Sequence, residues 1–124
     1  MAEIARLNIP LANYPSGSRE FGPINVNPAL RRLTFTVSRC TTATPTIWPN
    51  ESTTLDVSIE GLYGADWRPL GGALWSGGNS NERPTTSIIV DWSSTPDARP
   101  SQLRASLVIS GGPLRTSGAL VAED

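Results

Sequence analysis

Apolar and polar residues alternate with a period of two along most of this chain. Leu55, Val57 and Ile59 fall on one side of an extended segment, and polar residues fall on the other. This alternation predicts a β-strand with one buried and one exposed face. The same pattern predicts about eight strands, with the others at 5–11, 19–26, 33–37, 86–92, 103–109 and 114–122 and one that begins at residue 67.

Turns rather than helices separate these strands. The 124 residues include 11 Gly and 11 Pro, a composition typical of many turns. Strands joined without intervening helices form antiparallel sheets that pack face to face. The sequence therefore predicts an all-β fold, an antiparallel β-sandwich or jelly roll, built as a single domain over residues 1–124.

The alternation also predicts which side chains meet in the core and how some strands are joined. Gly71-Gly72 indicates a β-bulge, and Gly111-Gly112 indicates a two-residue hairpin turn with positive φ. Trp92 continues an inward row and is expected in the core. The common core is expected to contain Leu33, Phe35, Val37, Leu55, Val57, Ile59, Ile88, Val90, Leu107 and Ile109.

Residues 1–11 are predicted to be an N-terminal arm or an edge strand. Leu7, Ile9 and Leu11 fall on one face, and Pro10 falls on the other. Proline cannot donate to a ladder, so it favours an edge position, where unpaired backbone groups can bind a second chain. We expect Leu7 and Ile9 to contact a neighbouring chain. The alternative is that the segment only completes its own sheet.

The residue types argue against an enzyme. The chain has no His and one Cys, which excludes a Ser-His-Asp arrangement and a conventional zinc site. Asp56 and Glu60 would lie roughly 13 Å apart along one strand, too far for paired carboxylate chemistry. Cys40 has no thiol to pair with and is expected to be a small buried residue. We expect no catalytic residue, no cofactor and no metal.

Charge and hydropathy exclude two classes of partner. The chain has 10 basic and 11 acidic residues, whereas nucleic-acid binding needs clustered positive charge. It has no apolar run of 18 residues and begins without a charged and apolar leader, so we expect no membrane partner and no signal peptide. All ten basic residues are Arg, whose planar group suits bidentate contacts at interfaces.

Aromatic residues are the best candidates for binding. Exposed Trp and Tyr rings stack on sugars and are enriched at protein interfaces. A position in the core is the alternative for each of them, and for Trp48 the two are balanced. The candidate binding residues are Trp48, Tyr63, Trp67 and Trp75.

The segment Val57-Ser-Ile-Glu-Gly-Leu-Tyr-Gly-Ala-Asp-Trp-Arg-Pro-Leu70 resembles a hairpin in β-sandwich modules of tailed-bacteriophage structural proteins. In these modules a strand ends in a turn rich in Gly and Asp, and a Trp begins the next strand. The resemblance implies a capsid decoration or cementing protein, or a tail accessory protein, made in the host cytoplasm and located in the virion. Its expected partners are further copies of itself and a capsid or tail protein. Carbohydrate-binding modules use similar hairpins, so carbohydrate is the alternative ligand.

Overall fold

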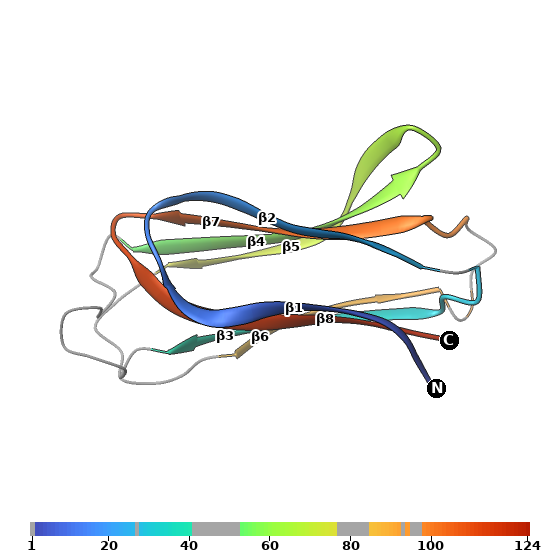
Figure 1. The fold of residues 1–124 in the computed structure, drawn as a ribbon, viewed down its shortest axis with the longest axis horizontal. Coiled ribbons are helices and arrows are strands. Elements are labelled where there is room, and N and C mark those ends of the chain that lie inside the picture. Colours follow the sequence, from blue (N-terminus) through green and yellow to red (C-terminus); the bar gives the residue numbers. More distant parts are fainter. Residues whose placement is uncertain (1, 27, 41–52, 77–84, 93, 95–97) are drawn as a thin grey trace.

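Two four-stranded sheets face each other in this protein (Figure 1). The structure is a computed structural model that describes residues 2–26, 28–40, 53–76, 85–92, 94 and 98–124. One sheet has the strand order β1-β8-β3-β6 and the other the order β2-β7-β4-β5. The strands are β1 (Glu3–Tyr14), β2 (Gly17–Asn25), β3 (Arg32–Cys40), β4 (Thr54–Tyr63), β5 (Asp66–Ser76), β6 (Thr85–Asp91), β7 (Gln102–Ser110) and β8 (Leu114–Glu123).

The order of the strands is that of a jelly roll. All six strand pairings are antiparallel. Apart from β4 and β5, strands that follow each other in the sequence lie in different sheets, so the chain repeatedly crosses from one sheet to the other. Eight strands wound in this way into two sheets make a jelly roll. The predicted all-β, antiparallel fold is confirmed.

The inward rows of both sheets form one buried cluster. Of the ten expected core residues, eight are buried, and Ile88 and Val90 are half-buried against them. Trp92 is also buried, as predicted. Leu30 has no exposed surface and was not predicted, because it lies in a turn without alternation. The other buried apolar residues are Ile9, Leu103, Ala105, Leu114, Leu120 and Ala122.

The prediction that Leu11 shares one face with Leu7 and Ile9 is wrong. In β1, Ile9 pairs with Gly118 and Ala12 with Thr116, so β1 carries one residue more than β8 over this stretch. An extra residue in one strand shifts the alternation of the side chains that follow it. Ile9 is therefore buried, whereas Leu11 is 49% exposed.

The expected hairpin at Gly111-Gly112 is also wrong, although both residues do have positive φ, of 79° and 137°. Pro113 belongs to the same connection, which joins β7 in one sheet to β8 in the other. The double glycine allows the sharp reversal, but the chain leaves its sheet there instead of pairing with the preceding strand.

Truncation of the buried residues Phe35 or Ile59 to Ala should lower the free energy of unfolding by about 2–5 kcal/mol. Both side chains have no exposed surface, so each truncation removes buried apolar contacts and leaves a cavity. Urea denaturation measures the loss, and Leu74→Ala, at a position that is 69% exposed, is the control. Losses below about 1 kcal/mol at both buried sites would show that they do not support the core.

Candidate functional site

The hairpin of β4 and β5 extends beyond the body of the sandwich (Figure 1). Gly64, with a φ of 66°, lies in the turn between the two strands. Ile59 pairs with Gly71 and Glu60 with Pro69, which leaves Leu70 as an extra residue in β5. The bulge predicted at Gly71-Gly72 is therefore present, one residue earlier.

The register of the hairpin determines which way its aromatic residues face. Between the bulge and the turn, Trp67 pairs with Leu62, and both share the outer face of the sheet with Glu60. Tyr63 is next to Leu62 in β4 and so lies on the opposite face. Successive residues of a strand alternate between its faces, so Tyr63 and Trp67 do not form one aromatic surface.

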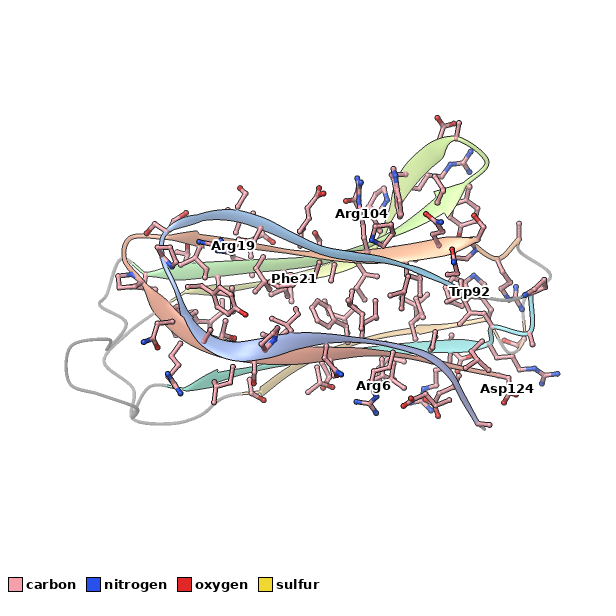
Figure 2. All side chains as sticks on the ribbon, in the orientation of Figure 1. Arg6, Arg19, Phe21, Trp92, Arg104 and Asp124 are labelled. Atoms are coloured by element: carbon pink, nitrogen blue, oxygen red, sulfur yellow. The ribbon has the colours of Figure 1, made fainter. Side chains whose placement is uncertain are left out.

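An arginine from β7 covers the Trp67 ring. The Arg104 guanidinium carbon lies 4.1 Å from the ring centroid, and Arg104 Nε donates a hydrogen bond of 3.0 Å to Glu60 Oε1. Arg104 and Glu60 face each other in the register of β7 and β4, and Arg104 lies on the outside of the sheet (Figure 2). The Arg104 and Glu60 side chains are 24% and 27% exposed. One face of Trp67 is therefore occupied from within the chain.

A second stack lies on the other face of the hairpin. The Arg68 guanidinium carbon is 5.2 Å from the centroid of the Tyr63 ring. These two residues line an open pocket of about 380 Å³ at the end of the sandwich. Its other lining residues are Pro69, Leu70, Trp92 and Ala98.

The predicted binding residues do not gather into one site. Trp75 is half-buried and packs against the core from the far part of β5. Leu7 is half-buried against the core and Ile9 is buried within it, both in β1 at the edge of its sheet. That the backbone edge of β1 contacts a neighbouring chain stays a prediction. Trp48 lies outside the described residues, as does the side chain of Cys40.

Arginine contacts with aromatic rings are a feature that the sequence did not locate. Besides the two stacks of the hairpin, Arg19 lies over Tyr14 at 5.7 Å. Arg99 lies over Trp92 at 5.6 Å and donates hydrogen bonds to the carbonyls of Leu30, at 2.7 Å, and Trp92, at 3.0 Å. The use of Arg without Lys was the one sign of such contacts, and here these planar groups serve the chain's own packing.

The described part of the chain contains no group of three or more His, Cys, Asp or Glu residues placed to hold a metal ion. Asp56 is exposed on the outer face, and Glu60 is paired with Arg104. Among the same residues there is no helix with the length and hydropathy needed to span a membrane.

Comparison by sequence finds no relatives: no protein-family model matches the chain, and no curated protein matches it.

Comparison by structure finds similar folds. A chain from the structure of infectious bursal disease virus, Gx strain, matches with a TM-score of 0.61 and 13% identity over 96% of this chain. This protein spans 31% of the length of that chain. A chain of broad bean stain virus matches with a TM-score of 0.48 and 10% identity, over 99% of this chain and 85% of that one. A CBM4 chain matches with a TM-score of 0.47 and 10% identity, over 84% and 61%.

Of these three matches, the infectious bursal disease virus chain has a TM-score above 0.5. At 13% identity, the match shows a shared fold. The jelly roll described above is thus also the fold of part of a chain from a virus.

Replacement of Arg104 by Gln should destabilise the hairpin, because it removes the ion pair with Glu60 and the contact with Trp67. The expected loss is about 0.5–2 kcal/mol in the free energy of unfolding. A double-mutant cycle with Glu60→Gln should give a coupling energy of about 0.2–1 kcal/mol, and the tryptophan emission should shift as the Trp67 ring is uncovered.

Arg6→Gln is the matched control for this prediction. Arg6 forms an exposed ion pair with Glu3, and the hydrogen bond and negative charge of Glu3 raise the pKa of the Arg6 guanidinium. Loss of this ion pair should leave the free energy of unfolding unchanged, since exposed ion pairs contribute little. Equal effects of the two substitutions would show that the Arg104 contacts do not hold the hairpin.

Proposed function

We propose that this protein is a non-enzymatic structural protein of a virus particle, a decoration or cementing protein of the capsid or an accessory protein of the tail. It acts by self-association and by binding to the surface of a capsid or tail protein. The observation that carries this proposal is the eight-stranded jelly roll, which is shared over 96% of the chain with a chain from infectious bursal disease virus.

The outer face of the β1-β8-β3-β6 sheet supports binding to a protein surface. Ala119 pairs with Thr36, and Val121 pairs with Thr34, which in turn pairs with Ile89. These side chains are small or β-branched and carry no charge, and Ile89 is 53% exposed. Charged residues border this uncharged patch, with Arg6 of β1 opposite Val121 and Arg32 opposite both Asp91 and Glu123. An uncharged centre with a charged rim is the usual arrangement of protein interfaces.

The chemistry of the chain supports binding rather than catalysis. The sequence has no His to act as a general base near neutral pH. Of the carboxylates considered as a pair, Glu60 accepts a hydrogen bond from Arg104, and Asp56 faces solvent. Neither carboxylate lies in the buried, apolar surroundings that are typical of a catalytic acid.

The geometry of the hairpin counts against the alternative, a carbohydrate-binding module. Sugar rings stack on exposed aromatic faces, and extended sites use several rings on one surface. Here Arg104 covers one face of Trp67, and Tyr63 lies on the opposite side of the hairpin under Arg68. Among the described residues, these rings form no common platform for a glycan.

The purified protein should self-associate and should not bind glycans. Size-exclusion chromatography with light scattering, run at increasing loading concentrations, should give a mass that rises above 13.2 kDa, because virion structural proteins act through contacts between copies. Affinity electrophoresis against soluble polysaccharides should show no retardation. A strict monomer that is retarded by a glycan, and whose retardation is lost in Trp67→Ala and kept in Leu74→Ala, would contradict the proposal.

A further inference from the structure

The sandwich has four edge strands, and three of them carry features that hinder pairing with another strand. Edge strands expose unpaired N–H and C=O groups, and proteins block them with proline and bulges. In β1, Pro10 lies beside a bulge, and its carbonyl accepts a hydrogen bond of 2.6 Å from the Tyr14 hydroxyl. In β2, Pro23 lies within a break in register. In β5, Pro69 lies beside the bulge at Leu70.

The fourth edge strand, β6, carries none of these features. Residues Thr85–Asp91 include no proline and no glycine. β6 pairs with β3 in unbroken register from Asp91 opposite Arg32 to Thr85 opposite Ser38. Among the described residues, no strand pairs with its other side. The sequence Thr-Thr-Ser-Ile-Ile-Val-Asp is rich in β-branched residues, which favour pairing in sheets.

The apolar layers are incomplete at this edge. Ile88 and Val90 point inward but are only half-buried, whereas Phe35 and Leu33, opposite them on β3, have no exposed surface. On the outer face of the same strand, Ile89 is 53% exposed. A further strand beside β6 would cover apolar side chains on both faces, which is favourable in addition to the backbone hydrogen bonds.

We propose that β6 is the contact between two copies of this chain, which pair antiparallel about a two-fold axis and join their sheets into one sheet of eight strands. The inference rests on the self-association in the proposed function and assigns it to one strand. With the axis at Ile89, that residue faces Ile89 of the partner subunit, and Ile88 faces Val90 of the partner subunit. Asp91 faces Ser87 of the partner subunit, so no like charges meet. The strand is thus complementary to itself, as a two-fold contact requires.

The contact is small, because β6 has seven residues. Small interfaces bind weakly, so association of the isolated protein should be concentration-dependent between roughly 10 µM and roughly 1 mM. In an assembled particle, many such contacts act together and strengthen one another.

The substitution Ile89→Lys tests this contact. A lysine on an edge strand opposes pairing, and here it would bring two like charges together. Sedimentation velocity should show the wild-type mass rising from 13.2 kDa toward twice that value with concentration, whereas Ile89→Lys should stay at the lower value. Its melting temperature should not change, because the side chain is exposed. Leu11→Lys, on the blocked edge β1, is the matched control and should associate like the wild type.

A crosslinking experiment tests the position of the contact independently of the sedimentation measurement. In a Cys40→Ser background, Ile89→Cys should yield a covalent dimer with a short bis-maleimide reagent, and Leu11→Cys should yield none. Wild-type association that survives Ile89→Lys, or that is lost in Leu11→Lys, overturns the β6 contact and leaves the proposed self-association standing. A wild type that stays monomeric over the whole concentration range, with no crosslinked dimer, overturns both.

Discussion

The packing of one apolar face of each sheet against the other holds this molecule together. Each sheet takes its strands from distant parts of the chain, since β1 pairs with β8 and β4 with β7. The two ends of the chain therefore meet, and the Ala2 and Asp124 backbones are joined by a hydrogen bond from Asp124 N to the Ala2 carbonyl. Neither sheet can form before most of the chain is present, so the two inward rows become buried together.

The burial of one face of each strand explains why the sequence predicts the fold class so well. In a strand with one buried face, apolar and polar residues have to alternate. Leu33, Phe35 and Val37 are the apolar residues of such a pattern, and all three are buried. Alternation identifies the face of a residue but not its sheet, so it did not show that the chain crosses between sheets at Gly111. It also fails where a bulge adds a residue, as at Leu11, and in turns such as the one that buries Leu30.

The candidate site was less predictable than the fold class, because alternation identifies the face of a residue but not its contacts with other strands. The sequence placed Tyr63 and Trp67 on one hairpin, because the turn between them is local. Their opposite faces follow from the register of the hairpin, in which Leu62 pairs with Trp67 and Tyr63 with Asp66. The cover over Trp67 comes from Arg104, which is 44 residues from its ion-pair partner Glu60. Such contacts depend on the register of strands that are remote in sequence, and a period-two pattern carries no information about that register.

The position of β6 follows from the same packing constraint. On this side of the sandwich, the edges of the two sheets lie so close that a Cβ at Gly71 of β5 would be 2.8 Å from Cγ2 of Ile88. Glycine in β5 thus lets Ile88 approach, and contacts between the layers together with the unbroken ladder to β3 hold β6 in place. An edge strand fixed in this way loses little conformational freedom when a further strand pairs with it, which lowers the entropic cost of association. Proline and bulges occur on the three other edges, where backbone pairing is hindered, and β6 is the edge at which the fold leaves both a regular backbone and uncovered apolar side chains.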